Sequence, residues 1–157
     1  QECKKIQSLG VTGIVIGMLD SSHDLPVSTL RRFRDQLGKT TLVYHRAFDE
    51  VKTPTKALGQ LYEIGFDGVL TSGQHPTALE GIDVLIDWKM RIKDDFFILP
   101  GGGINAQNCK KFDVAGFDWI HLSAKQLIKT KRASKFDATQ YKLDTTKLAD
   151  VLDRLRN

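Results

Sequence analysis

Hydrophobic positions along this chain alternate between short, nearly continuous apolar runs and longer stretches with helical spacing. The apolar runs have the length and composition of strands buried on both faces. They lie at residues 13–17, 42–48, 66–70, 96–99 and 117–122. Each run is followed by a segment whose apolar residues recur three or four positions apart, which predicts an amphipathic helix. These predicted helices lie at residues 26–37, 53–64, 78–92, 105–114 and 145–155.

This alternation predicts right-handed strand–helix–strand units and a parallel sheet, since one helix is available to cross back after each strand. The residues alone leave two architectures open, an open doubly wound sheet or a (β/α)₈ barrel. The predicted units are too few to close a barrel, which typically takes ~250 residues. Residues 1–9 resemble the tail of a helix that ends at Gly10. We therefore expect the opening units to be absent, and the sheet to be an arc with an exposed edge at residues 13–17.

Composition restricts the class of protein. The 157 residues are 41% hydrophobic and 27% charged, which indicates one globular domain spanning residues 1–157. Neither a membrane span nor a leader pattern is present, so the expectation is a cytoplasmic protein without a membrane partner. Cys3 and Cys109 belong to no zinc or disulfide pattern.

The net charge of +4 comes mainly from a basic stretch over residues 125–142. No aromatic residues interleave with the cations as they do in a nucleic-acid groove, so we interpret this stretch as a solvated loop and expect no nucleic-acid partner.

Candidate chemistry gathers where predicted strands end. His45, Arg46 and Asp49 follow the second strand, where they could serve as base, anion clamp and orienting carboxylate. Thr71 and Ser72 follow the third strand and offer neutral hydrogen bonds. His121, on the fifth strand, is a further catalytic candidate, although a lone histidine on an apolar strand is often a core residue.

A glycine-rich turn follows the fourth strand at Gly101, Gly102 and Gly103. Glycines allow positive φ and close backbone approach, and a helix predicted to begin at Asn105 would add free N–H groups. With Ser123 and Lys125 on the next loop, the turn is expected to bind a small anion such as a phosphate or carboxylate. The alternative is a tight turn without a ligand.

Taken together, these motifs resemble the copper homeostasis protein CutC family. The resemblance rests on HRAFDE (45–50), LTSGQ (70–74), ALEG (78–81), PGGGIN (100–105) and HLSA (121–124), in this order. It implies a TIM (β/α)₈ barrel that is cytoplasmic, homo-oligomeric and associated with copper. The chain would correspond to about strands 3 to 8, without the first two βα units. Two positions depart from the family pattern, Lys125 in place of an arginine and Ser22-His23 in place of an Asp-Gly turn.

Copper is thus implied by the resemblance and not by the ligands. Cu(I) prefers thiolate and thioether ligands, and the chain offers only Cys3, Cys109, Met18 and Met90, none paired by spacing. The metal ligands are therefore unknown. Two hypotheses remain, a CutC-like protein of copper homeostasis and a TIM-barrel enzyme acting on a small phosphorylated or carboxylated metabolite. Whether the chain is an enzyme stays open.

Overall fold

A four-stranded parallel sheet forms the centre of the protein. The computed structural model describes residues 9–128 and 140–156. The strands are β1 (Gly13–Ile16), β2 (Thr41–Tyr44), β3 (Gly68–Thr71) and β4 (Phe97–Pro100), and they lie side by side in sequence order. All three pairings are parallel, with Val15 opposite Val43 and Val69 opposite Ile98. The predicted parallel α/β sheet is confirmed.

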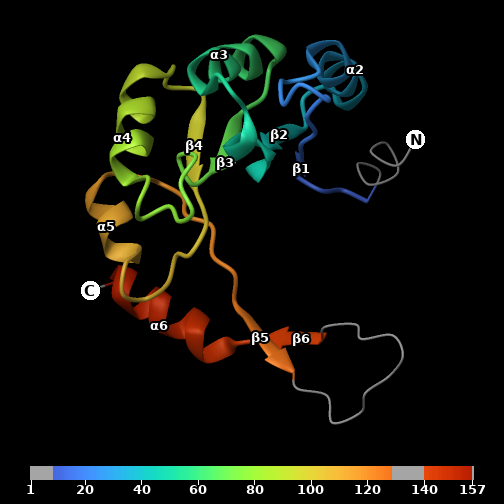
Figure 1. Ribbon diagram of the computed structural model, residues 1–157. Helices are drawn as coiled ribbons and strands as arrows, with labels where there is room; N and C mark the ends of the chain where they lie inside the picture. Colours follow the sequence, from blue (N-terminus) through green and yellow to red (C-terminus); the bar gives the residue numbers. More distant parts are fainter. Residues whose placement is uncertain (1–8, 129–139, 157) are drawn as a thin grey trace.

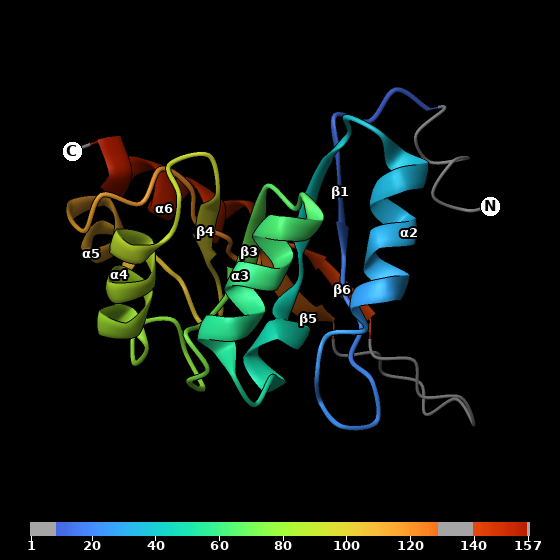
Figure 2. The ribbon, with the colours of Figure 1, turned by 90° about the horizontal axis from the view of Figure 1, so that it is seen from above.

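The helices follow one another around the outside of the sheet, as Figure 1 shows. They are α2 (Val27–Leu37), the 3₁₀ helix η1 (Arg46–Glu50), α3 (Pro54–Ile64), α4 (Ile82–Arg91), α5 (Cys109–Val114) and α6 (Thr145–Arg156). Viewed from above in Figure 2, α2, α3 and α4 form a layer along one side of β1, β3 and β4. None of the helices among the described residues is both long and apolar enough to cross a bilayer.

The hydrophobic core lies between this helical layer and the sheet. Leu42 and Tyr44 of β2 point into it, because alternate strand residues share a face. Phe48 of η1 packs edge-to-face on Trp88 of α4, with 5.6 Å between ring centroids. Leu61 of α3 is fully buried in the same cluster. Burial of one stripe on each helix therefore fixes the helical layer against the strands.

The predicted strand at 117–122 is wrong for most of its length. Within the described residues it is reduced to one parallel bridge, between Gly101 and His121. The basic stretch is also not simply a loop, because β5 (Lys125–Ile128) and β6 (Gln140–Leu143) form an antiparallel hairpin. Residues 129–139 of that stretch, like residues 1–8 of the predicted first helix, lie outside the described residues.

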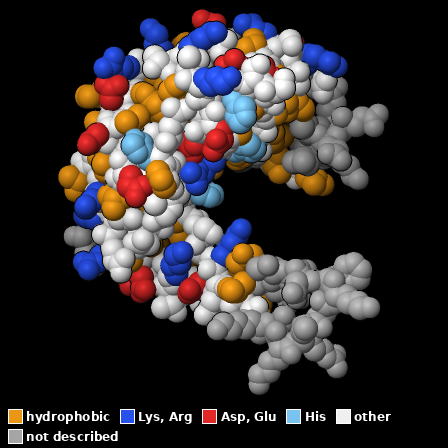
Figure 3. Space-filling view, viewed as in Figure 1, with side chains coloured by type: hydrophobic (Ala, Val, Ile, Leu, Met, Phe, Trp, Pro, Cys, Tyr) orange, Lys and Arg blue, Asp and Glu red, His pale blue; other side chains and the backbone are white. Residues whose placement is uncertain are grey.

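The sheet is open on one side. Among the described strands β1 lies at the edge, with Val15 57% exposed and Ile14 buried against the helices. In the space-filling view of Figure 3 the molecule curves around a wide opening. The expected exposed edge at residues 13–17 is confirmed. Within β1, Val15 is the one large apolar side chain that is mostly exposed.

Candidate functional site

The candidate site lies where β2, β3 and β4 end. Because parallel strands finish at one edge of a sheet, η1, the loop after β3 and the glycine turn after β4 are brought together there. Arg46 and Asp49 belong to η1, the loop after β3 begins at Ser72, and the glycine turn is Gly101–Gly103.

The Asp49 carboxylate is the most highly coordinated group of the site. Its Oδ1 accepts hydrogen bonds from the Thr71 hydroxyl, the Ser72 N–H (3.0 Å) and the Gln74 N–H (3.2 Å). Its Oδ2 accepts from Arg46 Nε at 2.7 Å and from the Ser72 hydroxyl at 3.0 Å. The side chain is only 9% exposed. A carboxylate held by this many donors anchors the loop after β3 to η1.

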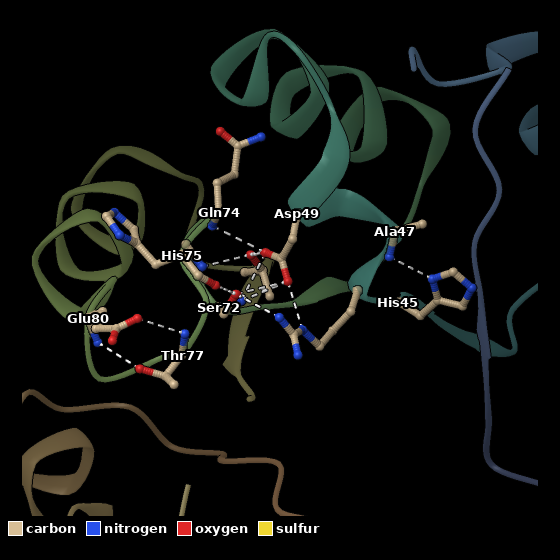
Figure 4. Close-up of polar contacts among 11 residues, drawn as sticks. His45, Ala47, Asp49, Ser72, Gln74, His75, Thr77 and Glu80 are labelled. Atoms are coloured by element: carbon tan, nitrogen blue, oxygen red, sulfur yellow. Dashed lines mark hydrogen bonds and ion pairs between the residues drawn. The ribbon is translucent and has the colours of Figure 1, made fainter. Parts of the chain in front are cut away.

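The expected role of Asp49 as the carboxylate that orients His45 is not supported by this geometry. Figure 4 shows Asp49 directed toward Ser72 and Gln74, and His45 on the other side of η1. The reason is that β2 ends at Tyr44, so the chain turns into η1 and separates the two side chains.

Arg46 extends from the carboxylate toward the glycine turn. Its Nη2 donates to the Ser72 hydroxyl at 2.9 Å. A Cβ built on Gly102 would lie 3.0 Å from Arg46 Nη1, so the guanidinium lies directly over that glycine. Two of the three nitrogens are thus fixed by Asp49 and Ser72, while the side chain remains 42% exposed. Nη1 is the guanidinium nitrogen nearest to the glycine turn.

His45 caps the start of η1. Its Nδ1 accepts a 2.9 Å hydrogen bond from the Ala47 N–H, so in this arrangement the neutral ring carries its proton on Nε2. The ring also lies against Gly17, where a Cβ would approach Nδ1 to 2.4 Å. In this arrangement Nε2 is the ring nitrogen that can donate, because Nδ1 accepts from the Ala47 N–H.

The glycine turn has the backbone that the sequence predicts. Gly102 and Gly103 have φ of 117° and 72°, a region that favours glycine. Among the described residues, no acceptor is recorded for the N–H groups of these two glycines, whereas both carbonyls are satisfied. The turn therefore presents two donors beside the Arg46 guanidinium.

The helix predicted to begin at Asn105 starts only at Cys109 and has six residues. The Asn105 side chain instead accepts from the Gln107 N–H at 2.9 Å, a local turn that competes with the helix. The Asn108 side chain ties the Asn105 N–H and the Gly103 carbonyl together. The prediction that a helix N-terminus at Asn105 adds free N–H groups to the glycine turn is therefore wrong.

The predicted cation of the turn, Lys125, is engaged elsewhere. It begins β5, and its Nζ lies 5.6 Å from the Tyr141 ring centroid in the hairpin. The Ser123 carbonyl accepts from Lys147 Nζ at 2.7 Å, while the exposed His121 forms the bridge to Gly101. The cation over the glycines is Arg46, which sequence reasoning had placed in a different cluster.

Gln74 is the site residue that sequence reasoning did not single out. It has a φ of 61°, its N–H donates to Asp49, and its side-chain amide donates to the Val51 carbonyl. Its place in the LTSGQ motif, two positions after Ser72, was the available signal in the sequence. Its role here is to join the loop after β3 to the end of η1.

The soft side chains do not assemble into a copper site in the part of the chain that is described. No group of three or more His, Cys, Asp or Glu side chains with metal-binding geometry occurs there. Cys109 is fully buried, Met90 is 74% exposed on α4, and Met18 is bonded through its backbone to the Tyr44 hydroxyl. These donors do not fit a Cu(I) site, so no step is assigned to a bound copper ion.

A parallel sheet whose strand ends gather an arginine–carboxylate pair, hydroxyls and a glycine turn defines an α/β protein with a polar site at the carboxyl edge. The sequence profile described as the CutC family matches residues 1–126. The chain belongs to the CutC family, as its motifs predicted.

Curated relatives agree with this assignment. The chain is 38% identical over 125 residues to the family protein CutC of Treponema denticola, which covers 79% of this chain and 51% of the relative. Against the Bacteroides fragilis family protein CutC it is 28% identical over 167 residues, with 100% and 66% covered. The chain thus spans 51–66% of the length of these relatives.

Solved structures support the fold. A crystal structure assigned to the copper homeostasis protein CutC of Streptococcus agalactiae matches with a TM-score of 0.71 at 22% identity, over 76% of this chain and 60% of that chain. A structure described as native KDPGal matches with a TM-score of 0.61 at 14% identity, over 99% and 63%. At these identities the likeness concerns the fold alone.

Proposed function

We propose that this chain acts in copper homeostasis. The observation that carries the proposal is the family match over residues 1–126, together with a solved neighbour described by that function. A cytoplasmic location and self-association are part of the same proposal. Because the described donors do not form a copper cage, copper would be cargo handled by the protein and not a resident cofactor.

The test is competition for Cu(I) against a chromophoric chelator under anaerobic conditions. The expected result is that the parent chain competes for Cu(I), and a variant that competes less well identifies a soft side chain that contributes to binding. The variants are Cys3→Ser, Met18→Leu, Met90→Leu and Cys109→Ser. Failure of the parent chain to compete at all would refute direct copper handling.

A second candidate function is supported by the glycine turn. We infer that the site binds a small phosphorylated or carboxylated metabolite between Arg46 Nη1 and the N–H groups of Gly102 and Gly103. The support is the Arg46 guanidinium, whose Nε and Nη2 are held by hydrogen bonds and whose Nη1 lies beside the glycine turn. A planar guanidinium that is already held in place suits the geometry of carboxylate and phosphate groups. Thr71 and Ser72 hold Asp49 and thereby the guanidinium, and are not themselves free donors in this arrangement.

Calorimetry with phosphate, sulfate and acetate tests the anion site. Arg46→Lys keeps the positive charge but loses the planar set of guanidinium donors. It should weaken anion binding by about 1–3 kcal/mol, the range of a charged hydrogen bond. Gly102→Val should abolish binding, because valine is strained at a φ of 117° and its side chain would meet the guanidinium. Lys125→Ala tests whether Lys125, which lies in the hairpin, contributes to anion binding. If Arg46→Lys and Gly102→Val bind as the parent does, the site is a structural turn.

We also infer that the sheet is an arc of a (β/α)₈ barrel. The support is the parallel order of β1 to β4, the helices outside them and the polar strand ends on one rim. An experimental structure in which a strand on the open edge of β1 runs antiparallel to it would contradict this inference.

A further inference from the structure

A cavity lies between α3 and α4, on the outer side of the sheet. Figures 1 and 2 show these two helices as neighbours. The segment between the end of α4 at Arg91 and the start of β4 at Phe97 completes its wall. Among the described residues that line it, none belongs to η1, to the loop after β3 or to the glycine turn. The cavity is therefore separate from the candidate site.

The floor of the cavity is apolar and aromatic. α3 contributes one helical face through residues three or four positions apart, namely Leu58, Gly59 and Tyr62. The end of α4 and the segment before β4 contribute Trp88 and Phe96. Leu58, Trp88 and Phe96 are at most 5% exposed. The volume is about 230 Å³, and a cavity of about 150 Å³ is enough to hold benzene. One aromatic ring therefore fits.

Gly59 keeps this space open. It lies within α3, it is not among the glycines with positive φ, and a Cβ built on it would meet no atom within 4 Å. Neither backbone conformation nor crowding requires glycine here, and glycine inside a helix is destabilising relative to alanine. The side of the helix that lacks a side chain is a wall of the cavity. A larger residue at this position would fill the space.

Positive charge lies at the rim. Two of the lining residues are the exposed cations Arg91 and Lys93, and no described lining residue is a carboxylate. Arg91 is already paired, because its Nε and Nη2 each lie 2.7 Å from Oδ1 of Asp87. Asp95, which is outside the lining, lies 3.5 Å from the Tyr62 hydroxyl. For Lys93 no ion pair is recorded within the described part of the chain. It is therefore the cation of the rim that an acidic ligand group can pair with.

We propose that this cavity binds a small aromatic monocarboxylate. The ring lies against Trp88 and Phe96, since aromatic rings pair favourably edge-to-face or offset. Tyr62 and Phe96 already form such a pair in the wall, with 6.3 Å between centroids and an interplanar angle of 76°. The carboxylate pairs with Lys93 at the rim, as a charge-assisted hydrogen bond. This site goes beyond copper handling and anion binding at the glycine turn, and shares no residue with them.

The experiment is a titration of the ¹⁵N-labelled chain with benzoate, followed by the indole N–H signal of Trp88 in NMR spectra. The chain has two tryptophans, so Trp119→Phe assigns the signal. The parent should bind with a Kd of about 1 mM or lower, on the scale expected of a ligand of this size. Gly59→Leu should abolish the response, because the leucine side chain occupies the cavity. Leucine is a good helix former, so thermal melts should show that this variant is at least as stable as the parent.

A second pair of variants tests the charge. Lys93→Met should weaken benzoate binding at least fivefold and leave the binding of benzyl alcohol, which has the ring without the charge, unchanged. Lys111→Met is the matched control, because Lys111 is an exposed cation on α5 outside the cavity. It should bind benzoate as the parent does.

A Trp88 signal that does not respond to benzoate in the parent overturns the proposal, as does a Gly59→Leu variant that binds like the parent. Benzyl alcohol binding as tightly as benzoate overturns the assignment of a carboxylate ligand. Equal losses in Arg46→Lys and Gly59→Leu also overturn the proposal, because benzoate would then bind at the glycine turn. Failure of the Cu(I) or phosphate titrations is a separate outcome, since neither reports on Trp88.

Discussion

At the scale of single residues, the site is organised by one carboxylate. Sequence reasoning identified Asp49 as part of a catalytic cluster because it follows a strand with His45 and Arg46. In the structure its oxygens are instead occupied by Arg46, Thr71, Ser72 and Gln74. Spacing alone could not reveal this, because three of those partners come from a loop more than twenty residues away in the chain.

Replacement of this carboxylate should destabilise the fold. Asp49→Asn replaces one acceptor oxygen with an NH₂ donor, which then faces the N–H donors of Ser72 or Arg46, and we expect a loss of about 2 kcal/mol in the free energy of unfolding, measured by urea denaturation. Asp113→Asn is the control, because Asp113 forms an exposed ion pair with Lys110 and should change stability by less than ~0.5 kcal/mol. Equal effects of the two substitutions would contradict the anchoring role of Asp49.

At the scale of elements, the long periodic segments were predicted well and the short or locally competing ones were not. α2 and α3 match their predicted spans because each buries an apolar stripe. The helix after the glycine turn starts four residues later than expected, since Asn105 forms its own turn. β5 and β6 were missed because each becomes a strand only by pairing with the other across the intervening segment.

Gly17, which follows β1, lies against the ring of His45 at the start of η1, and this contact gives a second prediction. In Gly17→Ala the new Cβ would lie 2.4 Å from His45 Nδ1, so the ring must move and lose its bond to Ala47. We expect a loss of about 1–3 kcal/mol in the free energy of unfolding, from overpacking. Gly59→Ala is the matched control, because Gly59 lies within α3 with open space at its Cβ position. It should stabilise the protein by about 0.5–1 kcal/mol. Thermal melts that rank the two variants in the opposite order would contradict this account.

At the scale of the whole molecule, stability should be unevenly distributed. Every residue of β3 is buried, whereas every residue of β5 is exposed and pairs only with β6. A two-stranded hairpin with neither face covered is marginal in water. We therefore expect β3 to be stably folded and the hairpin of β5 and β6 to open easily.

Hydrogen exchange measured by mass spectrometry tests this distribution. The amides of β5 and β6 should exchange at least a hundredfold faster than those of β3, because local opening of the hairpin breaks few buried contacts. Uniform exchange across β3 and the hairpin would instead show that the molecule opens as one unit.

The sequence by itself determined the family, the parallel α/β class, the order of the four central strands and the positive φ at Gly102 and Gly103. These follow from local composition, hydrophobic period and glycine spacing, which the chain carries along its length. Only the tertiary structure decided that Arg46 and not Lys125 lies over the glycine turn, that Asp49 is an anchor and that the basic stretch forms a hairpin. Those outcomes depend on contacts between segments far apart in the chain, and hydrophobic period carries no information about which side chains meet there.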